Sequence, residues 1–212
     1  MKNRLLSIIL ILVLSASVAI AQEKTKMSFG ILGGVNFQNL NGKLSSGDKL
    51  ENDMLLGFHG GVNVQIPIAP EFYFQPGLMF ATKGAKNTYT ILGSEFTDEI
   101  KINYIEMPLN LVYKGALGKG FLMLGFGPYL AYGISGKQVF KGKELTFERG
   151  VDYNALDAGA NIFAGFETAG GLFLQLDTQF GMLNINAADG NSSTDQATAK
   201  NTGFGLSLGY RF

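Results

Sequence analysis

The sequence predicts an all-β fold: an eight-stranded antiparallel transmembrane β-barrel with short periplasmic turns and four long extracellular loops. Eight segments of about ten residues alternate apolar with small or polar side chains, as expected of strands that span a membrane. Long and short connections between these segments alternate without exception. Glycine (29 residues) and phenylalanine (17 residues) are abundant, and only 16% of the residues are charged. Such a composition disfavours helices and suits short strands in a closed barrel.

The chain begins with the features of a secretory signal peptide. Lys2 and Arg4 precede a short apolar stretch, and residues 19–21 form a small-x-small cleavage signal. We therefore predict a signal peptide at residues 1–21, a single barrel domain at 22–212, and localisation in the outer membrane. A membrane anchor is the alternative, but the apolar run is short for a transmembrane helix.

Composition excludes several classes of function. Without the signal peptide the chain has 191 residues, with 15 basic and 17 acidic side chains, so it offers no basic surface for nucleic acid. It has no cysteine and one histidine, His59, which argues against disulfides and ordinary zinc or iron–sulfur sites. We expect no metal, no cofactor and no nucleic-acid partner.

The eight predicted strands follow one another along the chain. The last of them ends the sequence and places Phe204, Leu206 and Leu208 on one face and glycine, serine and arginine on the other. The others show the same alternation. The eight segments are residues 27–37, 55–66, 71–84, 103–115, 121–134, 156–167, 172–182 and 203–212.

Three segments depart from a simple alternation or allow a second interpretation. The fourth strand alternates cleanly only from Ile105 onward, which suggests a β-bulge before it. Residues 121–134 could form a short buried helix, but three glycines and Pro128 argue against one. Residues 155–166 also allow a helix, although a strand gives the more complete separation into two faces.

The connections indicate which end of the barrel faces which compartment. Short connections are typical of the periplasmic side of bacterial barrels and long ones of the outer side. The short ones are residues 67–70, 114–119 and 168–171. The long ones are residues 38–54, about 85–99, 135–152 and 184–202.

The faces of the strands distinguish a membrane barrel from a soluble, lipocalin-like barrel that binds an apolar ligand. In a soluble barrel the non-apolar face would meet water, yet here it is mostly glycine. An eight-stranded barrel has a lumen only just wide enough for side chains, so glycine beside the inward-facing Tyr73, Tyr129, Phe163 and Phe173 makes sense inside. The apolar face then meets lipid.

Aromatic residues on that apolar face form two predicted girdles, as expected at bilayer interfaces. The inner girdle comprises Phe72, Tyr113, Phe166, Tyr210 and Phe212. The outer girdle comprises Phe37, Phe58, Phe80, Tyr132, Phe180 and Phe204.

The inward face also carries ionisable residues, which we predict to form a hydrogen-bonded plug. They are His59, Glu106, Asp157, Glu167, Asp177 and Arg211. A polar conduit or a proton-linked path is the alternative. Some small outer-membrane barrels are enzymes with a His-Ser-acid set, but no serine lies at His-x-Ser spacing beside His59. A triad is recognised by geometry rather than order, so this motif is not required for one, but its absence argues against an enzyme and we predict no catalytic residue.

Four stretches carry a family resemblance: "YIEMPLNLVYKG", "FLMLGFGPYLAYGI", "LDAGANIFAGFE" and the final "GLSLGYRF". A Tyr104-x-Glu106-x-Pro108 strand before a Gly-x-Gly-Pro-Tyr strand, and an aromatic last residue, resemble the porin-family (PorT-like) outer-membrane β-barrel proteins of Gram-negative bacteria. The resemblance implies an outer-membrane location and says little about function.

These observations together favour a non-enzymatic structural or docking barrel with a plugged lumen. A narrow porin-like channel for small solutes is the alternative. We expect contacts with outer-membrane lipid and lipopolysaccharide, an envelope protein partner at the long loops or the periplasmic turns, and a monomeric barrel.

Overall fold

The computed structural model describes residues 26–91, 93–140, 143–147, 153–186 and 197–212. The predicted signal peptide at residues 1–21 lies outside the described residues. The strands in the described part are β1 (Ser28–Lys43), β2 (Leu55–Ala69), β3 (Phe72–Ile91), β4 (Ser94–Leu117), β5 (Gly120–Phe140), β6 (Lys143–Phe147), β7 (Leu156–Thr168), β8 (Leu172–Gly181) and β9 (Thr198–Arg211). No helix in this part is long and apolar enough to cross a membrane.

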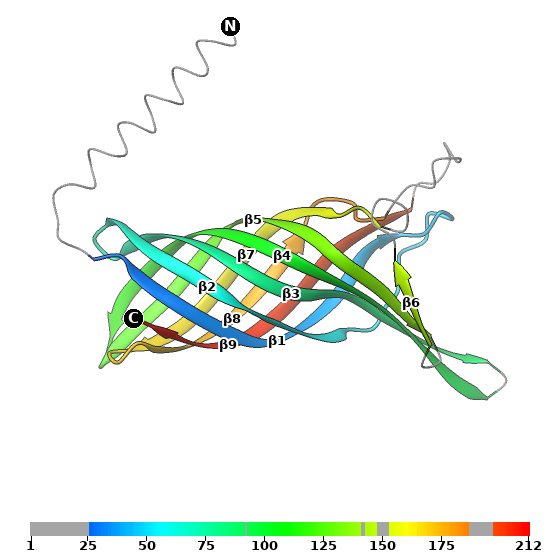
Figure 1. Ribbon diagram of the computed structural model, residues 1–212, viewed down its shortest axis with the longest axis horizontal. Coiled ribbons are helices and arrows are strands. Elements are labelled where there is room, and N and C mark those ends of the chain that lie inside the picture. Colours follow the sequence, from blue (N-terminus) through cyan, green and yellow to red (C-terminus); the bar gives the residue numbers. More distant parts are fainter. Residues whose placement is uncertain (1–25, 92, 141–142, 148–152, 187–196) are drawn as a thin grey trace, which may run out of the picture.

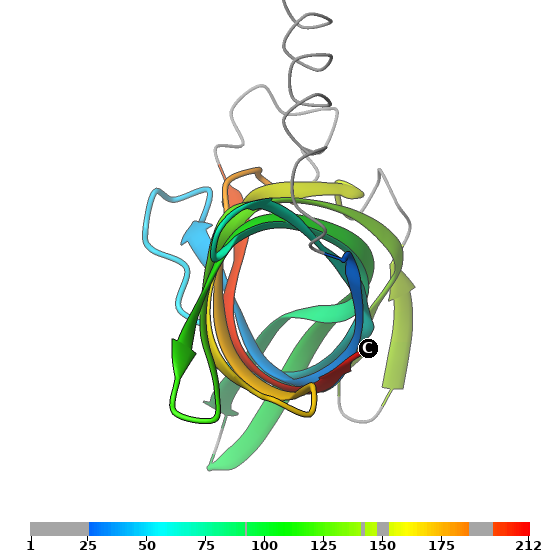
Figure 2. The same ribbon diagram turned by 90° about the vertical axis from the view of Figure 1, so that its left-hand side faces the viewer.

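Eight of these strands close into a ring, which confirms the predicted barrel (Figures 1 and 2). The order is β4-β3-β2-β1-β9-β8-β7-β5, and pairing of β4 with β5 closes the ring. Every neighbouring pair is antiparallel. The last strand pairs with the first, with Phe204 opposite Phe37, so the ring has no unpaired edge.

The apolar side chains point outward and the small and polar ones point inward. Along β9, for example, Phe204, Leu206 and Leu208 are exposed, whereas Ser207 and Arg211 are buried. The soluble lipocalin-like alternative required the apolar face to point inward, and the structure excludes it.

Three predictions about β4, β5 and β7 are confirmed. The β4–β5 register shifts between Asn103 and Tyr104, where the bulge was predicted. Both segments with a helical alternative, residues 121–134 and 155–166, form strands in β5 and β7.

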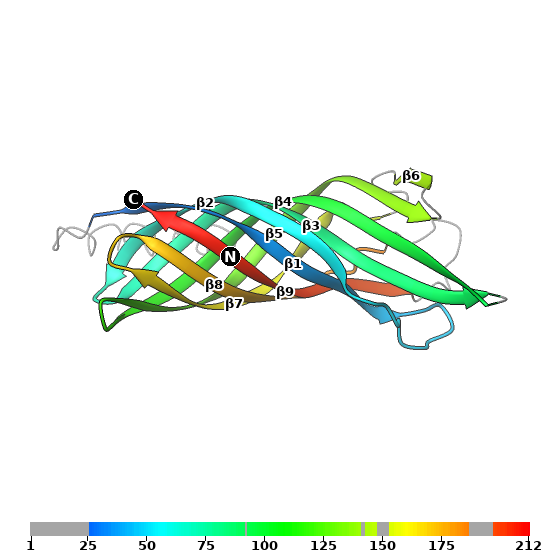
Figure 3. The ribbon, with the colours of Figure 1, turned by 90° about the horizontal axis from the view of Figure 1, so that it is seen from below.

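The strand ends that the long connections join lie at one end of the barrel, and two of these connections continue the strands beyond the ring (Figures 1 and 3). Residues 85–99, expected as a polar connection, extend β3 and β4 into a hairpin that pairs as far as Ile91 and Ser94. Gly93, with φ of 78°, supports the tight turn. The last five residues of β5, Gly136–Phe140, pair with β6 and form a second hairpin. We call these two extensions the protruding hairpins.

Candidate functional site

The lumen holds the candidate site, which begins with a central ionic cluster of Lys83, Glu106 and Asp157. Lys83 Nζ lies 2.6 Å from Glu106 Oε2 and 3.5 Å from Asp157 Oδ2. All three side chains are buried, and Lys83 is 0% exposed. Strands β3, β4 and β7 supply these residues, so the cluster links three strands of the ring.

Neutral side chains donate hydrogen bonds to the two carboxylates of this cluster. Gln179 Nε2 donates to Glu106 Oε1 at 2.6 Å. Tyr129 OH and Asn201 Nδ2 both donate to Asp157 Oδ2, at 3.2 and 3.0 Å. The ammonium group of Lys83 lies 4.2 Å from the centroid of the Tyr129 ring, a favourable cation–π distance. Buried charges persist only when paired in this way.

A terminal ionic cluster of Lys114, Glu167 and Arg211 lies toward the short-turn end. Glu167 accepts from Lys114 Nζ at 2.6 Å and from Arg211 Nε at 2.9 Å. The guanidinium group also donates to Asn63 Oδ1 at 2.9 Å and to Gln75 Oε1 at 3.3 Å. This cluster therefore connects β9 with β2, β3, β4 and β7.

Glycines on β1 make room for contacts between its two neighbours. Gly30 pairs with Asn63 on one side and Arg211 on the other. A Cβ at Gly30 would lie 2.8 Å from Asn63 Oδ1 and 3.1 Å from Arg211 Nη1. The inward glycines predicted to accommodate bulky side chains thus also let polar groups meet across a strand.

Gly34 serves the same purpose for His59 and Ser207, which pair with it from opposite sides. His59 Nε2 and Ser207 Oγ are 2.7 Å apart. The sequence offered no serine near His59, and barrel closure brings one from a strand 148 residues away. Both side chains line the lumen, and Ser207 is fully buried.

The structure places the six predicted lumen residues at inward positions but does not bring them into one network. Glu106 and Asp157 share Lys83, Glu167 and Arg211 form an ion pair, and His59 contacts Ser207. Asp177 lines a cavity between the two clusters. Sequence analysis missed Lys83 and Lys114. Both continue the inward alternation of their strands, and that alternation was the signal available.

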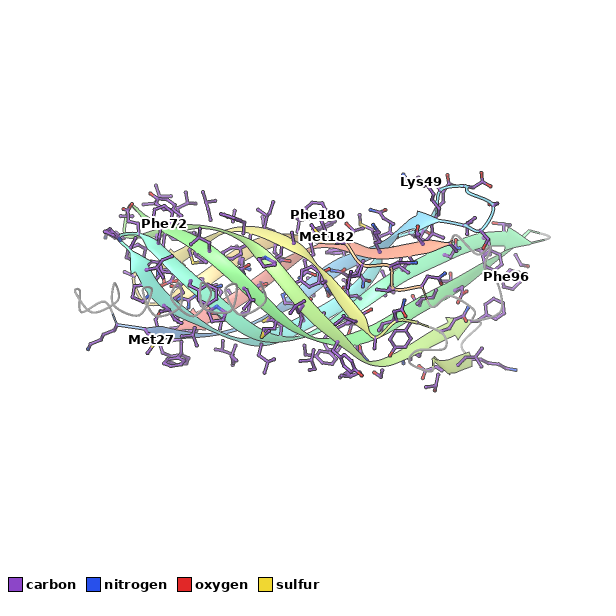
Figure 4. The ribbon with its side chains drawn as sticks, turned by 90° about the horizontal axis from the view of Figure 1, so that it is seen from above. Met27, Lys49, Phe72, Phe96, Phe180 and Met182 are labelled. Carbon is purple, nitrogen blue, oxygen red and sulfur yellow. The ribbon has the colours of Figure 1, made fainter. Side chains whose placement is uncertain are left out.

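The residues assigned to the girdles all lie on the outward face. Close pairs occur at both levels: Phe72 with Tyr113 and Phe37 with Phe204 have ring centroids 5.4 and 5.1 Å apart. Figure 4 shows Phe72 near one end of the long axis of the barrel and Phe180 near its middle. The protruding hairpins lie at the other end of this axis. The position of these rings relative to a bilayer stays a prediction.

Two groups of apolar side chains fill the lumen beside the ionic clusters. Toward the short turns, one group comprises Leu32, Val112, Met123, Phe163 and Phe173. Toward the long connections, the other comprises Leu40, Ala85, Ile102, Tyr104, Tyr129, Ala131, Tyr153 and Ile185. In the described residues, no group of three or more His, Cys, Asp or Glu side chains could hold a metal ion.

Comparison with known proteins identifies the family. No curated protein matches the chain. Among solved structures, it is similar to Neisserial surface protein A, with 10% identity, a TM-score of 0.49 and coverage of 87% of this chain and 97% of that one. It is also similar to Ail, the attachment invasion locus protein of Yersinia pestis, with 10% identity, a TM-score of 0.40 and coverage of 89% and 100%.

A family model described as "Outer membrane protein beta-barrel domain" matches residues 20–187, most of the chain. The match agrees with the ring of eight strands and with the outward apolar face. It also supports the predicted localisation. The chain belongs to the outer membrane protein beta-barrel domain family and is an outer-membrane β-barrel.

Proposed function

We propose that this protein is a closed, non-enzymatic barrel that presents the protruding hairpins as a docking surface outside the outer membrane. The observation that carries the proposal is the pair of buried ionic clusters, which tie opposite walls of the lumen together. Glu106 on β4, for example, accepts a hydrogen bond from Gln179 on β8. We also propose that the chain is a PorT-like member of the family, and the Tyr104-x-Glu106-x-Pro108 motif supports this.

The width of the barrel supports a closed lumen. Eight strands enclose a space about wide enough to be filled by side chains, whereas water-filled porins have about 16 strands or more. Here Tyr129, Phe163 and Phe173 are buried inside it. An open path would require the central cluster to separate, which would leave Lys83 and its two carboxylates unpaired in the lumen.

The position of the His59–Ser207 pair supports a non-enzymatic role. A serine nucleophile must reach its substrate, yet Ser207 Oγ points into the filled lumen and the side chain is fully buried. The cavity that both residues line has a volume of about 60 Å³. A lipid or peptide substrate does not fit there.

The protruding hairpins supply the docking surface. They combine exposed apolar groups with surface ion pairs: Leu145 is exposed, and Lys137 Nζ lies 2.6 Å from Glu144 Oε1. Rigid strands hold this surface beyond the ring (Figure 3). Exposed segments on a rigid scaffold are where binding residues concentrate. An envelope protein or the sugars of lipopolysaccharide are the partners that we propose.

Purified protein in liposomes should admit neither sugars nor amino acids at porin-like rates. The physical reason is the side-chain packing and the ionic clusters that fill the lumen. Liposome swelling in a small sugar measures the flux, with a 16-stranded porin as the positive control. Rapid swelling with this protein would instead establish the narrow-channel alternative.

A photo-crosslinking amino acid at Leu145 should capture a partner on intact cells, whereas one at Leu117 should not. Both leucines are exposed, but Leu145 lies on a protruding hairpin and Leu117 ends β4 beside a short turn at the opposite end of the barrel. Crosslinked adducts are identified by mass spectrometry and by staining for lipopolysaccharide. Adducts from Leu117 alone would move the docking surface to the short-turn end.

A further inference from the structure

A cavity of about 60 Å³ lies in the lumen between the two ionic clusters. Its lining includes Glu106 of the central cluster, and Asn63 and Gln75, which contact Arg211 of the terminal cluster. A water molecule occupies about 30 Å³ in the liquid. The space therefore suits one small hydrated ion and not an organic ligand.

The cavity is rich in oxygen acceptors that lack donors. Asn36, Gln38, Asn110 and Asn161 line it, and each is 6% exposed or less. Within the described residues, no donor contacts the amide oxygen of any of the four. The orientation of Asn36 is fixed, since its Nδ2 donates to the carbonyl of Thr82 at 2.9 Å. Buried acceptors of this kind are normally satisfied.

Negative charge is also in excess at this level of the lumen. Glu106 and Asp157 share the single ammonium group of Lys83. Asp177 lines the same cavity, and its carboxylate forms none of the ion pairs found in the described part of the chain. Three carboxylates therefore face one cation, an imbalance that a divalent ion would neutralise.

We propose that this cavity binds one calcium ion. The carboxylate of Asp177 and the amide oxygens that line the cavity would supply its ligands, together with water, while Glu106 stays paired with Lys83. Calcium takes about 6–8 oxygen ligands and accepts carboxylates, side-chain amide carbonyls and water in a flexible geometry. Magnesium needs a stricter octahedron and holds its water more tightly, so it fits this mixed set of side chains less well.

The ion would connect β1, β4 and the neighbouring pair β7 and β8, which lie on different sides of the ring. Asn36 and Gln38 belong to β1, Asn110 to β4, Asn161 to β7 and Asp177 to β8. A chain without cysteine has no disulfide to link opposite walls, and a bound ion would provide such a link. This role goes beyond the docking function and does not depend on it.

Calcium should stabilise the folded full chain. We would strip the protein with EDTA in lipopolysaccharide-free zwitterionic micelles and measure its melting temperature by circular dichroism. At about 100 times the dissociation constant, calcium should raise the melting temperature by about 5–10 °C. Equilibrium dialysis should find one tightly bound calcium ion per chain, and magnesium should give a smaller shift.

Asp177→Asn should abolish both the shift and the bound ion, since it removes one charged ligand with almost no change in shape. Asp48→Asn, which removes the same charge from an exposed connection, should leave both unchanged. If Asp177→Asn fails to fold, Asn161→Ala tests the same site and should weaken the shift. The absence of a calcium effect in the wild type, or an equal effect in the site variants, would overturn the proposal.

Discussion

Replacing Lys83 with methionine should lower the free energy of unfolding by about 3–5 kcal/mol, the range for removing one partner of a buried ion pair. The change deletes the ammonium group that Glu106 and Asp157 share, at 2.6 and 3.5 Å, and leaves both carboxylates buried without a cation. The methionine side chain is similar in shape to that of lysine, so the loss of stability reflects the missing charge and not a change in volume. Urea titration in detergent micelles, followed by gel mobility of unheated samples, measures the change.

Lys101→Met is the matched control. Lys101 also lies 2.6 Å from a carboxylate, that of Glu99, but the lysine side chain is 29% exposed. An exposed pair is worth about 0–1 kcal/mol. Adding Glu106→Gln to Lys83→Met should recover part of the loss, because it removes one of the unpaired charges. Equal losses from Lys83→Met and Lys101→Met would show that the central cluster does not stabilise the barrel.

The strands and their faces were predictable because both depend on a period of two along the chain. Each strand of the ring buries one face, so the sequence alone identifies inward positions such as Glu106 and Asp157. Which of these positions meet was not predictable. Gln179 reaches Glu106 across the lumen from 73 residues away, and the number of strands and the shear of the closed ring determine that contact.

The protruding hairpins show a different limit of the sequence analysis. Residues 85–99 are polar, and beyond the membrane both faces of a strand meet water, so strand and loop have similar compositions there. Thr88, Tyr89 and Thr90 nevertheless favour β-structure. Their pairing with residues 95–97 extends the hairpin. A local preference for strands was present in the sequence, but the alternation that identifies a spanning strand was not.

The outward face gives the second large prediction, because a lipid-facing leucine and a water-facing leucine respond differently to charge. Leu176 lies on β8 within the apolar band, opposite Ala164 and Leu206 on the neighbouring strands. Leu145 lies on β6, outside the closed ring. Each is 61% exposed in the isolated chain. Solvent accessibility alone therefore predicts that a charged substitution changes the stability equally at both positions.

Leu176→Arg should lower the free energy of unfolding in lipid vesicles by about 2–4 kcal/mol, the cost of an arginine near the bilayer midplane. Leu145→Arg should change it by about 0.5 kcal/mol or less, as for an ordinary surface substitution. Denaturant titration of the protein folded into phospholipid vesicles measures both. Because the two leucines are equally exposed, the difference isolates the contribution of lipid. If Leu176→Arg were as well tolerated as Leu145→Arg, the band around Leu176 would have to face water, and the assigned position of the membrane on the barrel would be wrong.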